Sequence, residues 1–192
     1  MLFDTHAHLN FSAFDGKVSS VITDSKKAGV GNITVPGTDI ESSRKAVEIA
    51  EKYDGVYAAV GIHPHHAFEY VEQKKNSVDQ DIKELKKILD HDSSLYILHS
   101  TFHIVAIGEV GLDRYEYKKT KYKDYKIGEE FIDLQKELLI AQLALAKKYK
   151  LSVIVHNREA KGDMLSLLDK RWDSYFERRM VFHCCEPDAE IL

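Results

Sequence analysis

Histidines recur in this chain where short apolar runs end. His6 and His8 close the run that opens the sequence, and they lie two positions apart. In a β-strand, this spacing directs both side chains to the same face. Neutral imidazole is the commonest protein ligand for zinc and similar divalent ions. The pair therefore predicts half of a metal site.

Four later apolar runs have the same construction. They are residues 57–62 before His63, 104–108 before Glu109, 152–155 before His156 and 180–182 before His183. Each run is short and almost uniformly apolar, which is typical of a strand buried on both faces of a sheet. Parallel sheets of α/β barrels collect their chemistry at the carboxyl ends of the strands. We therefore expect these ligand-type residues to meet at one end of a barrel.

The segments between the apolar runs have helical periodicity. Apolar residues recur at three- and four-residue steps in the ranges 17–28, 42–53, 78–89 and 133–148. A further apolar run, residues 31–35, ends at the turn signal Pro36-Gly37. Strands and helices alternate, which favours βαβ units and a parallel sheet. We expect six strands, beginning near Leu2, Asn32, Tyr57, Val105, Ser152 and Met180.

The length of the chain limits how complete such a barrel can be. An eight-stranded (β/α) barrel usually takes about 250 residues, with about 200 near the lower limit. This chain has 192 residues, and a helix should follow its sixth strand where it stops. The pattern predicts an α/β fold of the TIM type, C-terminally truncated to about six βα units, in a single incomplete domain over residues 1–192. Either the chain is a fragment, or it closes differently from a full barrel. We expect exposed strand edges, and hence modest stability or association with another copy.

Composition is that of an ordinary globular domain. Hydrophobic residues make up 44% and charged residues 30%, so a sizeable core is possible. The formal net charge of −4 argues against a broadly cationic nucleic-acid surface, so a phosphate substrate must be held locally. No apolar run approaches the roughly 20 residues that span a bilayer, and no secretory leader precedes His6. We therefore expect a cytoplasmic protein.

Two further features leave alternatives open. Cys184 and Cys185 are adjacent, so a disulfide between them would be strained, and a disulfide framework is excluded. They are either soft metal ligands beside His183 or small core side chains, and we favour the core. Residues 115–126 are rich in Lys and Tyr. They form either a solvated insertion, which we favour, or a flap that stacks on single-stranded nucleic acid and contacts its phosphates.

Five segments, taken in order, identify a family resemblance. They are Phe3-Asp4-Thr5-His6-Ala7-His8-Leu9, Gly61-Ile62-His63-Pro64, Ala106-Ile107-Gly108-Glu109-Val110-Gly111-Leu112-Asp113, Val155-His156-Asn157-Arg158-Glu159-Ala160 and Phe182-His183-Cys184. These segments closely resemble the motifs of TatD-family metal-dependent deoxyribonucleases. That family belongs to the amidohydrolase-like metal-dependent hydrolases with a TIM-barrel fold. The resemblance runs from end to end and implies the same architecture here.

The resemblance also implies roles for individual residues. The implied metal ligands are His6 and His8 for a first ion, Glu109 as the bridge between two ions, and His156 and His183 as the remaining imidazoles. A bridging carboxylate holds two cations about 3.5–4 Å apart, close enough to activate one water. The two divalent ions would be Mg²⁺, Mn²⁺ or Zn²⁺. Glu109 and His63 are the expected catalytic residues, and His63 and Arg158 are expected to face the substrate phosphate. Asp4 and Asp113 are candidates for orienting the ligand histidines.

The implied function is hydrolysis of DNA phosphodiester bonds by a two-metal site and a metal-activated water. The expected substrate is single-stranded DNA or frayed 3′ ends, degraded 3′ to 5′. The sequence also departs from the family: its Thr-Asp-x-Pro motif is absent, and Cys184-Cys185-Glu186-Pro187 stands where Phe-Ser-Gly is usual. Asp188 offers no evident replacement for the missing aspartate. Two alternatives therefore stay open. One is a weakly active or inactive remnant that binds metal or nucleic acid, and the other is a hydrolase of another ester or amide bond.

Overall fold

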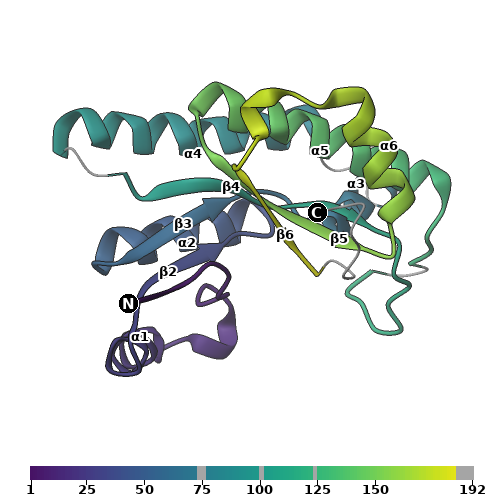
Figure 1. Ribbon diagram of the computed structural model, residues 1–192. Helices are drawn as coiled ribbons and strands as arrows, with labels where there is room; N and C mark the ends of the chain where they lie inside the picture. Colours follow the sequence, from purple (N-terminus) through teal and green to yellow (C-terminus); the bar gives the residue numbers. More distant parts are fainter. Residues whose placement is uncertain (73–76, 100–101, 123–124, 185–192) are drawn as a thin grey trace.

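Strands and helices alternate along the whole described chain, as a computed structural model shows for residues 1–72, 77–99, 102–122 and 125–184 (Figure 1). The strands are β1 (Leu2–Asp4), β2 (Val30–Pro36), β3 (Val56–Val60), β4 (Ile104–Asp113), β5 (Ser152–Arg158) and β6 (Met180–His183). The α-helices are α1 (Val18–Lys27), α2 (Ile40–Lys52), α3 (Phe68–Glu72), α4 (Val78–His99), α5 (Glu129–Tyr149) and α6 (Lys161–Arg171). Short 3-10 turns are η1 (Ser12–Phe14), η2 (Pro64–Ala67) and η3 (Ser174–Phe176).

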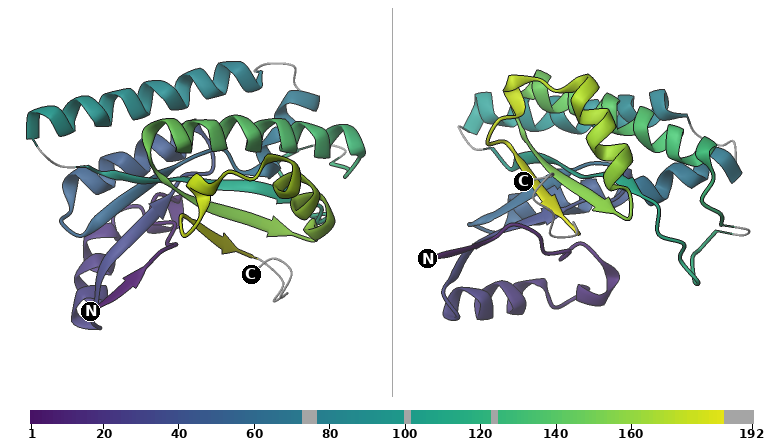
Figure 2. Two further views of the ribbon diagram at one scale, coloured as in Figure 1. Left: turned by 45° about the horizontal axis from the view of Figure 1, so that its top comes forward. Right: turned by 45° about the vertical axis from the view of Figure 1, so that its right-hand side comes forward.

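The strands form one parallel sheet in sequence order, β1-β2-β3-β4-β5-β6. At least one α-helix lies between each pair of successive strands, which is the connection of a (β/α) barrel. Figure 1 shows α4, α5 and α6 along one side of the sheet, and Figure 2 shows β1 and β6 at its open side. The predicted α/β fold with six parallel strands that alternate with helices is confirmed, and the sheet is a curled half-barrel.

Burial separates the middle of the sheet from its edges. Strands β3, β4 and β5 are almost entirely buried, as predicted from their apolar runs. The same prediction is wrong for β6, in which Val181 is 47% exposed. In β1, Leu2 is 66% and Phe3 47% exposed. Both are edge strands, so one side of each lacks a pairing neighbour among the described residues.

Two glutamines of α5 bind the strand ends that lead into the site. Gln142 accepts a hydrogen bond from the Ile62 N–H at 2.7 Å and donates one to the Ile62 carbonyl at 3.1 Å. Gln135 makes the same pair of bonds with the backbone of Asp113, at 2.8 and 3.0 Å. Both amides are fully buried, and both satisfy backbone groups at places where the sheet ladder ends. Helix α5 thereby fixes the positions of the segments after β3 and β4.

Element boundaries differ from the predicted ones mainly in two places. Helix α4 continues beyond the predicted end at Leu89 to His99. Strand β4 continues beyond Glu109 to Asp113, so this glutamate lies inside a strand and the predicted strand end is wrong. None of the helices in the described part of the chain combines the length and apolar character that crossing a bilayer requires.

Candidate metal centre

Glu109 lies at the centre of the histidines singled out by the sequence. The register of β4 against β5 shifts between Ile107 and Val110, and such an irregularity can redirect a side chain that regular pleating would orient differently. The Glu109 side chain is only 4% exposed. Burial alone would raise the pKa of its carboxyl, but contacts with His156, His6 and His8 outweigh burial and lower the pKa well below its usual range. Glu109 is therefore an ionised acceptor at neutral pH.

One oxygen of Glu109 faces the two histidines that follow β1. Glu109 Oε2 lies 3.3 Å from His6 Nε2 and 3.5 Å from His8 Nε2, and the two nitrogens are 3.1 Å apart. Zinc–nitrogen bonds of 2.0–2.1 Å in a tetrahedron place two ligand nitrogens about 3.3 Å apart. The three atoms therefore form a triangle of the size that a single tetrahedral cation requires. His6 Nδ1 is buried and has no hydrogen-bond partner within the described ranges.

The other oxygen of Glu109 faces a second set of imidazoles. Glu109 Oε1 lies 2.7 Å from His156 Nδ1, 3.8 Å from His63 Nε2 and 3.8 Å from His183 Nε2. On its other side, His156 Nε2 is 3.0 Å from Asp113 Oδ2. Burial lowers the pKa of His156, but the hydrogen bonds with Asp113 and Glu109 outweigh it and raise the pKa to about 9. This ring is thus held between two carboxylates.

His63 follows β3 and has a fixed ring orientation. The backbone N–H of His65 donates to His63 Nδ1 at 3.1 Å, so the proton of the neutral ring resides on Nε2, which points toward Glu109. Burial, reinforced by the charge of His156, lowers the pKa of His63 to about 3. At neutral pH this residue is therefore an uncharged hydrogen-bond donor.

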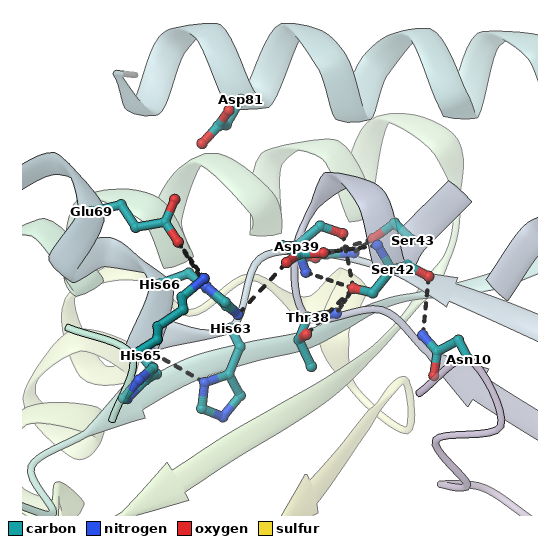
Figure 3. Close-up of polar contacts among 12 residues, drawn as sticks. Asn10, Thr38, Asp39, Ser42, Ser43, His63, His65, His66, Glu69 and Asp81 are labelled. Carbon is teal, nitrogen blue, oxygen red and sulfur yellow. Dashed lines mark hydrogen bonds and ion pairs between the residues drawn. The ribbon is translucent and has the colours of Figure 1, made fainter. Parts of the chain in front are cut away.

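His66 links the segment after β3 to two neighbouring acidic residues, as Figure 3 shows. His66 Nδ1 is 3.2 Å from Glu69 Oε1, and His66 Nε2 is 3.9 Å from Asp39 Oδ2. Asp39 also forms the capping box of α2 with Ser42. His65 packs between aromatic rings, and burial lowers its pKa to about 4. These contacts hold the rim of the site in one arrangement.

Arg158 lies at the end of β5, and its guanidinium is stacked on tyrosines of the Lys- and Tyr-rich segment. The guanidinium carbon is 3.7 Å from the centre of the Tyr115 ring and 5.3 Å from that of Tyr117. Arg158 Nη1 donates to the Tyr117 hydroxyl at 3.3 Å, and this hydroxyl donates to Asp113 Oδ2 at 2.8 Å. A single chain of contacts thus joins Arg158 to His156. The individual role of Tyr117 has no signal in the sequence beyond the composition of its segment.

An open cavity of about 390 Å³ lies over Glu109 and several of the histidines around it. It is lined by His8, Phe11, Thr38, His63, His65, His66, Glu109, Tyr117, Lys119 and His156. Tyr117 and Lys119 thus bring the segment 115–122 into the cavity wall, whereas its residues 123–124 lie outside the described ranges. The segment is attached to α3, because the buried Tyr122 donates its hydroxyl proton to Glu69 at 2.8 Å. It therefore packs on the site, and a purely solvated insertion is the wrong interpretation for these residues.

The structure brings all the predicted ligands together. The position of Cys184 differs from its prediction. The described residues contain three groups whose ligand atoms lie within 4.8 Å of one another: His6, His8 and Glu109; His63, Glu109 and His156; and His156, His183 and Cys184. Cys184 is exposed, so the predicted core position is wrong for it. Cys185 and Asp188 lie outside the described ranges. The Asp4 carboxylate accepts a hydrogen bond from the backbone N–H of His6 at 3.0 Å, whereas Asp113 contacts the ring of His156 directly.

Comparisons with known proteins identify the family of the chain. The family described as TatD related DNase matches residues 3–192. An uncharacterized metal-dependent hydrolase, YabD of Bacillus subtilis, is 35% identical over 191 residues, which is 100% of this chain and 63% of the relative. The protein named 3′-5′ ssDNA/RNA exonuclease TatD from Yersinia pseudotuberculosis is 32% identical over 192 residues, which cover 100% of this chain and 62% of the relative.

A solved structure shows the same fold. The crystal structure of YJJV, a TatD homologue from Escherichia coli K12, superposes with a TM-score of 0.71 at 30% identity and covers 97% of this chain and 61% of that chain. This chain thus spans about three-fifths of the length of the curated relatives it matches. From the family match over nearly the whole sequence and the parallel half-barrel that it folds into, we conclude that this chain belongs to the TatD related DNase family of metal-dependent hydrolases.

Proposed function

We propose that this chain hydrolyses phosphodiester bonds of DNA as a 3′-5′ exonuclease on single strands or frayed ends, using two divalent cations. The observation that carries this proposal is the position of Glu109, whose two oxygens face separate sets of imidazoles. His6 and His8 would hold one ion, His156 and His183 the other, and Glu109 both. Two such ions, Mg²⁺, Mn²⁺ or Zn²⁺, would activate water and stabilise the entering and leaving oxygens.

The residues around the ions have distinct tasks in this proposal. His63 presents a fixed Nε2–H to a phosphate oxygen, because its Nδ1 is occupied by the His65 backbone N–H. Arg158 supplies a permanent positive charge, and its guanidinium can bind two phosphate oxygens at once. Asp113 orients His156. A net charge of −4 requires that phosphate be held by local groups, and Arg158 and Lys119 are cationic groups beside the cavity.

The choice of a nucleic-acid substrate rests on two kinds of support. Relatives about 30% identical are named 3′-5′ ssDNA/RNA exonucleases. In this chain, the rings of Phe11 and Tyr117 line the cavity together with Lys119. Aromatic rings with nearby cations bind successive bases and phosphates of single strands with little sequence preference.

To test this proposal, the metal-loaded chain is incubated with single-stranded and duplex oligonucleotides that are labelled at the 5′ or the 3′ end. Small esters and amides serve as alternative substrates. The proposal expects stepwise shortening of single strands from the 3′ end, with the activity lost in a His6→Ala/Glu109→Ala double variant. The exposed Glu116 offers a matched control, Glu116→Ala, that should keep it. Cleavage confined to small esters or amides, or equal nuclease activity in the double variant, would overturn the assignment.

A second candidate is a protein that binds metal or nucleic acid with little turnover. The observation that favours it is the exposure of one side of the site: the His183 side chain lies on an edge strand and is 39% exposed. Water reaching this side weakens the electrostatic stabilisation that a closed site gives to a transition state. Metal binding with unchanged oligonucleotide under all conditions above would support this candidate.

We further propose that residues 1–192 act as one domain and that copies can associate through the edge strands. Leu2, Phe3 and Val181 expose large apolar side chains on β1 and β6. An edge strand with unpaired backbone groups and apolar side chains is a site for pairing with another chain. Sedimentation measurements over a range of concentrations test this point.

A further inference from the structure

Cys184 lies beside two of the imidazoles of the centre. A ligand atom of His156, one of His183 and the Cys184 sulfur lie within 4.8 Å of one another. The thiol is free and exposed, so it neither fills the core nor forms a disulfide. A thiolate and two imidazoles are a ligand set that binds zinc tightly.

The backbone explains how neighbouring residues reach the same ion. In a regular strand, His183 and Cys184 would point to opposite faces of the sheet. Cys184 instead has a φ of +54°, in the left-handed region that non-glycine residues seldom adopt. The chain therefore leaves β6 with a turn at this residue, and the alternation is broken where the ligand groups converge. Non-glycine residues in this conformation are concentrated at functional sites.

We infer that Cys184 is a protein ligand of the second cation, together with His156 and His183, and that this position takes a soft ion such as Zn²⁺ rather than Mg²⁺. The inference rests on the proposed function only in placing a cation at these imidazoles. With Zn–S near 2.3 Å and Zn–N near 2.0–2.1 Å, the sulfur and nitrogens must lie about 3.5 Å apart, which side-chain rotation can reach from the observed spacing. Glu109 Oε1, 2.7 Å from His156 and 3.8 Å from His183, offers the fourth position.

The choice of metal follows from the chemistry of the sulfur. Thiolates bind zinc and other soft ions, whereas Mg²⁺ requires oxygen ligands in a near-octahedral arrangement. The group formed by His6, His8 and Glu109 has no sulfur, so the two positions would differ in metal preference. The two-ion centre would then be asymmetric, with the softer ion next to β6.

Cobalt provides a test that does not depend on activity. Co²⁺ added to the full metal-free chain should give visible ligand-field bands and a near-ultraviolet thiolate-to-cobalt charge-transfer band. The adjacent cysteines supply a matched pair of variants: Cys184→Ser should lose the charge-transfer band, and Cys185→Ser should keep it. A charge-transfer band that persists in Cys184→Ser would overturn the inference. A charge-transfer band that is lost in Cys185→Ser but kept in Cys184→Ser would overturn it as well.

The same titration separates this inference from the proposed function. Absence of both kinds of band in the wild-type chain would refute the metal centre as a whole, and Cys184 as a ligand with it. Ligand-field bands without a charge-transfer band would refute the role of Cys184 and leave the proposed function standing.

Thiol alkylation gives a second readout. In the Cys185→Ser chain, Zn²⁺ should slow the reaction of Cys184 with iodoacetamide by about tenfold or more, because a metal-bound sulfur is a poor nucleophile, and Mg²⁺ should not. His183→Ala should remove this protection. His6→Ala should keep it, because His6 faces the other oxygen of Glu109. Circular dichroism verifies that each variant is folded. Equal alkylation rates with and without Zn²⁺ in a chain that binds Zn²⁺ would contradict the inference.

Discussion

The imidazole rings of His6 and His183 are stacked, with their centres 3.9 Å apart and their planes inclined by 10°. These residues belong to the two ends of the strand order, because His6 follows β1 and His183 closes β6. Their contact therefore requires that the sheet curl until its carboxyl ends nearly meet. The predicted ligands His6 and His183 can thus converge on Glu109, although no strand joins β6 to β1 among the described residues.

Replacing Glu109 by glutamine should remove the shared ligand of both ions. The neutral amide keeps the shape of the side chain but is a far weaker metal ligand than a carboxylate. Even residues that only orient ligands change metal affinity by about 10–100-fold, so the loss at Glu109→Gln should exceed about 100-fold. Isothermal titration with Zn²⁺ measures it, and Glu116→Gln serves as the exposed control. Unchanged affinity for both ions would contradict the bridging position.

Tyr117→Phe should weaken the orientation of His156 without loss of folding. The Tyr117 hydroxyl donates to Asp113, which holds His156 Nε2. A net hydrogen bond contributes about 1 kcal/mol, which corresponds to about a fivefold fall in kcat. Tyr115→Phe is the matched control, because the contact of Tyr115 with Arg158 is made by its ring, which phenylalanine keeps. Steady-state kinetics on an oligonucleotide compare the two variants, and equal kcat values would refute this role for the Tyr117 hydroxyl.

Arg158→Lys should raise KM for an oligonucleotide more than it lowers kcat. Lysine keeps the charge but loses the planar guanidinium that stacks on Tyr115 at 3.7 Å and can grip two oxygens. One lost charge-assisted hydrogen bond corresponds to about a tenfold or greater rise in KM. A fall in kcat with KM unchanged would instead assign Arg158 to the chemical step.

Charges on the edge strands should suppress association of copies. Leu2→Lys and Val181→Lys each place an ammonium group on an exposed edge, where lysine opposes strand pairing. Analytical ultracentrifugation should then show less dimer at a given concentration than for the wild-type chain. The exposed Trp172, which follows α6, supplies the control variant Trp172→Lys. The same reduction in this control would point to a general effect of charge.

The sequence suffices to predict which side chains meet at the carboxyl end of the sheet, because each belongs to a local pattern. Short apolar runs revealed the strands, and the topology of successive βα units brings their ends together without knowledge of side-chain contacts. The sequence does not reveal that Glu109 lies inside a strand, because this charged residue ends the apparent apolar run at Gly108 while the strand continues to Asp113. The core prediction for Cys184 is wrong because hydrophobicity alone does not distinguish a core thiol from one at an exposed edge.

Contacts between distant segments had no such local signal. Gln135 and Gln142 look like polar interruptions of an apolar helix stripe, and only the tertiary structure shows them binding the backbone of Asp113 and Ile62. Tyr117 likewise gains its position only when its segment folds back over Asp113. Side chains that satisfy backbone groups or orient ligands depend on the three-dimensional arrangement, which periodicity does not encode.

The attachment of the Lys- and Tyr-rich segment should depend on pH through Glu69. Hydrogen bonds, first from His66 and then from Lys121 and Tyr122, lower the pKa of Glu69 well below its ordinary value of about 4.5. A carboxyl with a depressed folded pKa contributes stability that is present above its unfolded pKa and is lost as the pH falls toward the folded one.

Wild type should therefore exceed Glu69→Gln in unfolding free energy by a constant amount above about pH 6. The difference should be about 1 kcal/mol or less, because the Glu69 side chain is 32% exposed, and it should shrink as the pH falls below about 4.5. Urea denaturation between pH 4 and 8 measures this difference. The control is Glu116→Gln, which changes an exposed glutamate of the Lys- and Tyr-rich segment itself. A difference that grows toward low pH would have the opposite sign and would exclude an ionised Glu69 as the anchor of this segment.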